Sequence, residues 1–218
     1  MKKIVSILIA LMLLMAFGSS ALAKTEDEIL FRSIPWGSTY KETISKLEDI
    51  GVTWGTSSPY KTGKKELTTG FTVSSKKVKD FSVAGNNVSS IVLYFAYDMN
   101  NPTSEDSAVF VQAEYVFETD TNASGIETDL KEKMSSVYSE PDDKSSKSFA
   151  NDFTHYWYWY GGNNSKVTLY HNYTEPFFMK SMASDELTLT YTSGQMEKLN
   201  NAYYEMLNKE NNKNTDGL

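Results

Sequence analysis

Cysteine is absent from this chain of 218 residues, and histidine occurs only twice. Without cysteine the chain has no thiol nucleophile, no disulfide framework, no zinc finger and no lipid-modified cysteine anchor. The base of a Ser-His-Asp triad would have to be His155 or His171, and neither lies in a sequence context typical of such a triad. The scarcity of these two residue types therefore argues against nucleophilic catalysis.

Basic residues are fewer than acidic ones. The chain has 21 Lys and Arg against 28 Asp and Glu, a net charge of −7 and a pI near 5.0. This balance argues against nucleic acid or an anionic membrane surface as a partner. Apolar residues make up 40% of the chain, and its aromatic residues are 14 Tyr, 11 Phe and 4 Trp. Such a composition excludes a disordered chain and suffices for one packed core.

The N-terminus has the pattern of a secretory signal peptide. Two lysines precede an apolar run over residues 4–17, and Ala21-Leu22-Ala23 matches a small-x-small cleavage site. The run is shorter than the roughly 20 residues that span a membrane. We expect residues 1–23 to be removed and the mature protein to be soluble, with no membrane contact, and secreted or extracytoplasmic. An exported domain without disulfides is more typical of bacteria than of animals.

Three segments of the mature chain have helical patterns. Capping-box spacing opens the first two, in Thr39 with Glu42 and in Ser124 with Glu127. Gly51 and Pro141 mark their ends. One face of each segment is apolar, formed by Ile44, Leu47 and Ile50 in the first, by Ile126, Leu130, Met134 and Val137 in the second, and by Met196, Leu199, Tyr203 and Leu207 in a third helix over about 195–208.

Strand-like runs follow each of the first two helices. They are rich in β-branched and aromatic residues and cover 67–73, 78–83, 91–97, 109–117, 153–160, 166–173 and 186–192. The helix-then-strands order occurs twice, about 85 residues apart, and predicts two similar halves over about 31–118 and 122–208. We expect one α+β domain over residues 24–208, in which an antiparallel sheet has helices on one face and a C-terminal helix. Residues 209–218 are expected to form a frayed polar tail.

The phrase Phe31-Arg32-Ser33-Ile34-Pro35-Trp36-Gly37-Ser38 opens the first half. It resembles the opening of uncharacterised secreted proteins from Gram-positive gut bacteria. The element order is similar to the tandem repeat of β-lactamase-inhibitory proteins and of small outer-membrane assembly lipoproteins, which implies a binding module with a concave sheet. Independently of that resemblance, Trp36 is expected to pack beside the helix cap as a structural residue.

The motifs of common enzyme classes are missing. The chain has no Gly-x-Ser-x-Gly, His-Glu-x-x-His or Gly-x-Gly-x-x-Gly pattern. Glu114 and Glu118 share a strand face, but four residues along a strand separate them by roughly 13 Å, too far for a catalytic carboxylate pair. We expect no enzyme and no cofactor, and a hydrolase that uses carboxylates alone remains a less favoured alternative.

His155 and His171 fall on the two arms of a predicted hairpin around residues 161–164. A register that pairs Trp157 with Leu169 places the two histidines opposite each other, close enough to share a metal ion, whereas a one-residue slip puts them on opposite faces. Only Asp152 or Glu175 offers a third ligand nearby in the sequence. We therefore expect ordinary strand residues here and assign no metal site.

Aromatic residues crowd the same hairpin, namely Phe153, Tyr156, Trp157, Tyr158, Trp159, Tyr160, Tyr170 and Tyr173. Because strand side chains alternate, the tryptophans at 157 and 159 and the tyrosines at 156, 158 and 160 must point to opposite faces. A core buries tryptophan readily, whereas a buried tyrosine needs a partner for its hydroxyl group. The tryptophans are therefore expected inside, and the tyrosines on the open face.

These aromatic residues lead to the functional prediction. The candidate binding residues are Tyr156, Tyr158, Tyr160 and Tyr170. We expect an exported bacterial binding module without catalytic residues, which contacts a protein through this face. A carbohydrate-binding module, in which sugars stack on the tyrosines, is the alternative. In a third interpretation the tyrosines form a cross-strand ladder that only stabilises the sheet.

Overall fold

The computed structural model describes residues 27–60, 69–76, 78, 81–97, 107–119, 122–149, 152–174 and 185–213. The expected signal peptide and the last residues of the expected tail lie outside the described residues. Three helices are described, α2 (Tyr40–Glu48), α3 (Ala123–Tyr138) and α4 (Gln195–Lys213). The strands are β1 (Trp54–Tyr60), β2 (Gly70–Ser75), β3 (Ser82–Val83), β4 (Asn86–Ala96), β5 (Val109–Phe117), β6 (Asp143–Phe149), β7 (Asp152–Tyr160), β8 (Lys166–Thr174) and β9 (Asp185–Thr192).

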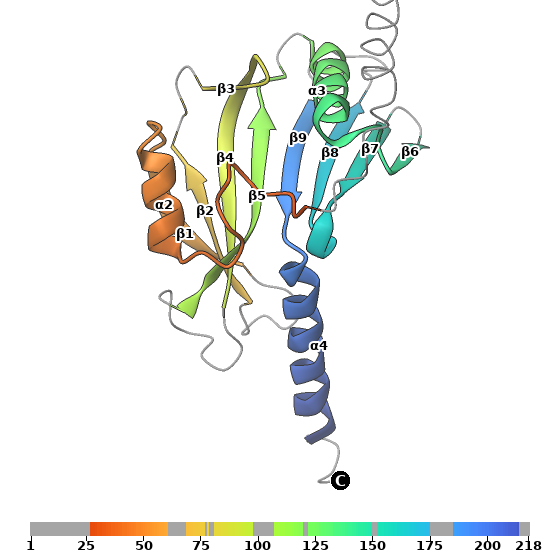
Figure 1. Ribbon diagram of the computed structural model, residues 1–218. Coiled ribbons are helices and arrows are strands. Elements are labelled where there is room, and N and C mark those ends of the chain that lie inside the picture. The colour runs from red at the N-terminus through yellow and green to blue at the C-terminus, as the bar shows by residue number, and fades with distance from the viewer. Residues whose placement is uncertain are drawn as a thin grey trace, which may run out of the picture.

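The nine strands form one sheet in the order β1-β2-β4-β5-β9-β8-β7-β6, with β3 paired to β4. Every pairing in it is antiparallel. The predicted α+β class, with an antiparallel sheet and a C-terminal helix, is therefore confirmed. Each half is a helix followed by an antiparallel meander, and the two meanders meet where β5 pairs with β9 (Figure 1).

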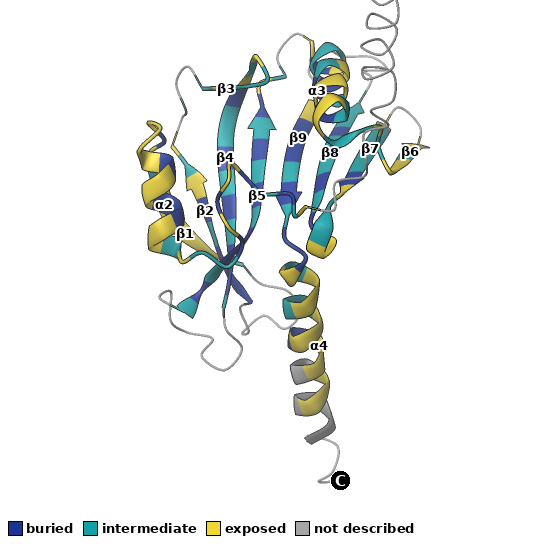
Figure 2. Cartoon of the chain, viewed as in Figure 1, coloured by how far each residue is buried: buried dark blue, intermediate teal, exposed yellow. Residues whose placement is uncertain are grey.

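The core lies between one face of the sheet and a layer formed by α2, α3 and the segment 27–39 (Figures 1 and 2). Phe31, Ile34 and Trp36 of that segment are buried. The ring of Trp36 stacks on Phe110 at 4.9 Å between ring centroids, and its Nε1 donates a hydrogen bond of 2.8 Å to the carbonyl oxygen of Ile29. Trp36 is thus a core residue, as expected.

The predicted capping box of α2 is present. The hydroxyl oxygen of Thr39 accepts a hydrogen bond from the backbone N–H of Glu42, and the Glu42 carboxylate accepts one from the backbone N–H of Thr39. Gly51 follows the helix with a φ of 87°, a conformation that favours glycine. The predicted apolar face holds for two of its members only, because Ile50 lies beyond the helix and is exposed.

The predicted capping box of α3 is wrong. The N-cap residue is Asn122, and its side chain makes no capping hydrogen bond. Ser124 lies inside the first turn and is exposed, while the side chain of Glu127 turns toward the sheet. The buried stripe of α3 therefore runs through Ala123, Glu127, Leu130 and Met134, and Val137, expected on the apolar face, is exposed.

Two strands were not predicted, and both are edge strands. β1 and β6 close the two ends of the sheet, and their residues are mostly exposed. Their sequences, Trp-Gly-Thr-Ser-Ser-Pro-Tyr and Asp-Lys-Ser-Ser-Lys-Ser-Phe, lack the alternating apolar pattern of a half-buried strand. Lysine, proline and short polar residues at sheet edges discourage pairing with another chain. Because such residues replace the apolar ones, these edge strands lack the alternation by which strands are predicted from sequence.

Helix α4 continues to Lys213, past the predicted end near residue 208. Tyr203 of the predicted stripe is buried, and Met196 and Leu199 are partly buried. Among the described residues, no helix combines the length and the apolar character that a membrane-spanning segment requires.

The two capping predictions make a matched pair of substitutions. Thr39→Ala removes a real cap and should lower the free energy of unfolding by about 1 kcal/mol. Ser124→Ala removes a hydroxyl group that caps nothing and should leave that free energy unchanged within about 0.5 kcal/mol. Urea denaturation followed by circular dichroism measures both values, and equal losses in the two variants would contradict the described helix starts.

Candidate functional site

The β7–β8 hairpin has the register that brings the two histidines together. Trp157 pairs with Leu169, and His155 pairs with His171. The turn between the strands contains a short 3-10 helix over Gly162–Asn164. This register determines which side chains share a face, because a shift of one residue would exchange the two faces of each strand.

The two tryptophans face the helices, as expected. Trp159 is fully buried, and its Nε1 donates a hydrogen bond of 3.0 Å to the carbonyl oxygen of Ser139, just after α3. Trp157 is partly buried, and the ammonium group of Lys131 lies 4.7 Å from the centroid of its ring. Both rings thus help to attach α3 to the sheet.

The four candidate tyrosines lie on the opposite face of the hairpin, and we call this surface the tyrosine face. The rings of Tyr156 and Tyr158 are nearly parallel, with centroids 6.0 Å apart, and those of Tyr158 and Tyr160 are 6.4 Å apart. Tyr170 packs on Tyr156 at 5.0 Å. All four side chains are at least partly exposed, Tyr160 by 39%. Within the described part of the chain, their hydroxyl groups take part in no hydrogen bond.

A cavity of about 690 Å³ adjoins one end of this face. Tyr160 and Lys166 line it from the hairpin, and Glu197, Asn200 and Asn201 line it from α4. Its wall thus combines one aromatic ring with amide and charged groups. The cavity has the concave form typical of a small-ligand site.

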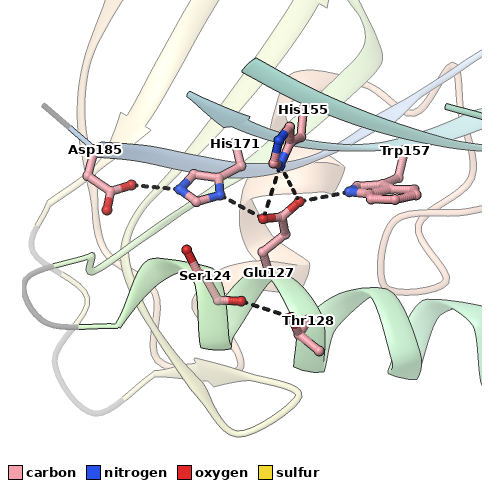
Figure 3. Close-up of polar contacts among 7 residues, drawn as sticks. All are labelled: Ser124, Glu127, Thr128, His155, Trp157, His171 and Asp185. Atoms are coloured by element: carbon pink, nitrogen blue, oxygen red, sulfur yellow. Dashed lines mark hydrogen bonds and ion pairs between the residues drawn. The ribbon is translucent and has the colours of Figure 1, made fainter. Parts of the chain in front are cut away.

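A second candidate site lies on the other face of the hairpin, around the carboxylate of Glu127 (Figure 3). Nε1 of Trp157 donates a hydrogen bond of 2.9 Å to Oε1 of Glu127. Nδ1 of His171 lies 2.8 Å from Oε2, and Nδ1 of His155 lies 3.2 Å from Oε1. On its far side, Nε2 of His171 lies 2.9 Å from Oδ1 of Asp185. We call these five side chains the Glu127 cluster.

The cluster is buried except at its margins. His171 is 1% exposed and Glu127 is 9% exposed, whereas His155 is partly exposed and Asp185 is exposed. Burial alone would raise the pKa of Glu127, but the hydrogen bonds from His171 and Trp157 and the charge of the histidines lower it to about 2. Burial would lower the pKa of His171, and its hydrogen bonds to Glu127 and Asp185 outweigh that effect and raise it.

The sequence predicts that the two histidines can meet, but it does not predict the two carboxylates, Glu127 and Asp185, that contact them. Of the third ligands considered, Asp152 accepts a hydrogen bond from Thr174 instead, and Glu175 lies outside the described residues. The residue that does meet the histidines, Glu127, comes from α3. Its signal was present, since an acidic residue occupies one position of the stripe that α3 buries. The predicted role of Glu127 in a capping box concealed that signal.

Glu127, His155 and His171 together offer the kinds of atoms that bind metal ions. One nitrogen from each histidine and one oxygen of Glu127 lie within 4.8 Å of one another. Imidazole nitrogens and a carboxylate oxygen are ligands of zinc and related ions in proteins. The imidazole and carboxylate groups of the Glu127 cluster are groups that can bind a cation or a proton.

Comparison with known proteins gives no relative. No protein-family model, no curated protein and no solved structure matches this chain.

Replacing the central carboxylate tests the energetic role of the cluster. In protein dialysed against a chelator, Glu127→Gln should lower the free energy of unfolding by about 2 kcal/mol, because buried charge-assisted hydrogen bonds are lost. Glu132→Gln, an exposed change of the same kind on the same helix, should have no effect.

The loss should also depend on pH. Because the pKa of Glu127 is lowered in the folded protein, Glu127 stabilises the fold fully above about pH 4.5, and this stabilisation is lost as the pH falls toward about 2. Because the pKa of His171 is raised in the folded protein, His171 stabilises the fold fully below pH 6.5. This stabilisation is lost as the pH rises through the pKa of His171 in the folded state. Urea unfolding of the wild type and Glu127→Gln should differ most between about pH 4.5 and 6.5. A difference independent of pH would contradict the ionised cluster.

Proposed function

We propose that this chain is an exported bacterial binding module without catalytic residues, which recognises a protein partner through its tyrosine face. The sequence of residues 1–23 supports export. The observation that supports binding is the row of Tyr156, Tyr158 and Tyr160, whose rings are parallel and partly exposed and whose hydroxyl groups lack hydrogen bonds to described residues.

The surface chemistry of the tyrosines and the small entropy cost of ordering them favour a protein partner. Tyrosine is enriched in protein interfaces because its ring covers a large apolar area and its hydroxyl group can still form a hydrogen bond. Each ring of the row packs on its neighbour, so little side-chain freedom remains to be lost on binding. Such a preorganised surface favours association without further rearrangement.

A polysaccharide is the second candidate ligand, and the cavity beside Tyr160 favours it. Asn200, Asn201 and Glu197 offer the hydrogen-bonding groups that sugar hydroxyls require. Tyr160 lies both in the row and in the cavity wall, so a sugar chain on the tyrosines would reach these groups.

Crosslinking from the tyrosine face tests the first candidate. A photoreactive phenylalanine analogue at position 158 or 170 should capture one and the same surface protein of the producing bacterium. The same analogue at position 204, an exposed tyrosine on α4, should not capture it. Failure at 158 and 170, or equal capture at 204, would contradict a protein-binding role of this face.

Tyr158→Ala then measures the contribution of the row. It should weaken binding of the captured protein by roughly tenfold or more, because central aromatic residues of an interface contribute most of its affinity. Its melting temperature should stay within about 2 °C of the wild type, and Tyr204→Ala should change neither quantity. A large loss of thermal stability in Tyr158→Ala with unchanged affinity would mean that the tyrosines only stabilise the sheet.

Titration of tryptophan fluorescence with soluble cell-wall and dietary polysaccharides tests the second candidate. A saturable change that Tyr160→Ala abolishes would make carbohydrate the ligand. A flat response to every polysaccharide would exclude these sugars and leave the protein partner as the proposal.

A further inference from the structure

The Glu127 cluster brings together residues that are scarce in this chain. His155 and His171 are its only histidines, and they converge on one carboxylate from a different element. The three side chains come from α3, β7 and β8, so no local sequence constraint explains why they meet. Glu127 and His171 are buried. In a buried site, a hydrogen-bond acceptor or a charge that has no partner costs free energy.

His171 is held in an orientation that suits a metal ligand. Its Nε2 faces the carboxylate of Asp185 at 2.9 Å, and its Nδ1 faces Oε2 of Glu127 at 2.8 Å. When Nε2 donates its proton to Asp185, the lone pair of Nδ1 points at the centre of the cluster. A carboxylate on the far nitrogen is the usual support of a metal-binding histidine, because it fixes the ring and its tautomer.

Glu127 has similar support. The N–H group of Trp157 donates to Oε1, which fixes the carboxylate between the two histidines (Figure 3). Tryptophan has a donor and no acceptor, so it holds the carboxylate without competing for a cation. Oε2 then faces Nδ1 of His171, and either a proton or a metal ion must lie between these two acceptors for the contact to be favourable.

The geometry points to a binding site for one divalent transition-metal ion of the zinc class, formed by Glu127, His155 and His171. Two imidazoles and a carboxylate make up a known protein ligand set for zinc, with a fourth position left for water. The nitrogen ligands disfavour Ca²⁺ and Mg²⁺, which bind through oxygen. In this proposal Asp185 and Trp157 are positioning residues, and the ion would join α3 to the β7–β8 hairpin.

Binding requires small movements of the ligands, because Nδ1 of His171 and Oε2 of Glu127, now 2.8 Å apart, must separate while the more distant ligand atoms come together. The ligand atoms are up to 4.8 Å apart, whereas tetrahedral zinc with bonds of about 2.0–2.1 Å holds its ligands about 3.4 Å apart. His155 is the most exposed of the three, and its Nδ1 lies 3.2 and 3.5 Å from the two oxygens of Glu127, close to the spacing that zinc requires. As the most exposed ligand, His155 has the most freedom to adjust to the ion, and its exposed edge provides the entry path.

The experiment uses the purified protein without a histidine tag, dialysed against a chelator. Zn²⁺ is titrated at neutral pH and followed by calorimetry and by NMR of the imidazole C–H groups, of which the chain has two sets. We expect one Zn²⁺ per chain, shifts at both histidines and a rise in melting temperature. Co²⁺ should give the visible absorption of a four-coordinate site, and Mg²⁺ should not compete.

Variants assign the ion to this site. His155→Ala should abolish measurable Zn²⁺ binding, and because its side chain is partly exposed the variant should still fold. Asp185→Asn, which retains all three ligands, should weaken binding by roughly 10–100-fold. Glu132→Gln should bind as the wild type does. The absence of Zn²⁺ binding by the wild type, equal affinity in His155→Ala, or a shift at only one histidine would each overturn the proposal and leave a protonated hydrogen-bonded cluster.

Discussion

The pairing of β7 with β8 is the constraint on which both candidate sites depend. With His155 opposite His171, strand alternation places the histidines and tryptophans toward α3 and the tyrosines away from it. A slip of one residue would bury tyrosine hydroxyl groups and expose Trp159, which is fully buried here. Burial of the tryptophans and solvation of the tyrosine hydroxyls therefore favour the same register. The short turn that contains Gly162–Asn164 also favours this register, because the length of a hairpin turn determines which residues of the two strands pair.

Glu127 gives this register a further, polar determinant. A carboxylate that accepts from Trp157 and contacts two histidines can do so only when these three side chains share a face. Its hydrogen bonds offset the cost of burial, which is why its pKa falls to about 2 although desolvation acts in the opposite direction. Because a buried ionic group that loses its partners costs free energy, the cluster disfavours positions of α3 in which these contacts are not made.

Much of the fold could be predicted from the sequence. The strand alternation, the Thr39 capping box and the repeated helix-then-strands order depend on local residue patterns, and the structure has them. The edge strands β1 and β6 could not be predicted, because exposed polar residues have no period that hydrophobicity can reveal. The tyrosine face followed from strand alternation together with the preference of tryptophan for the core. The Glu127 cluster did not, because Glu127 and Asp185 reach the histidines through the packing of α3 and the pairing of β8 with β9. Contacts of that kind are nonlocal.

The arrangement of faces can be measured directly, because the chain contains no cysteine. Single cysteines placed in turn at Tyr156, Trp157, Tyr158 and Trp159 report the accessibility of each position through the rate of thiol labelling under native conditions. We expect fast labelling of Tyr156→Cys and Tyr158→Cys and slow labelling of Trp159→Cys, with Trp157→Cys between them. Fast labelling of Trp159→Cys in a folded protein, or equal rates at all four positions, would contradict the register and both sites that depend on it.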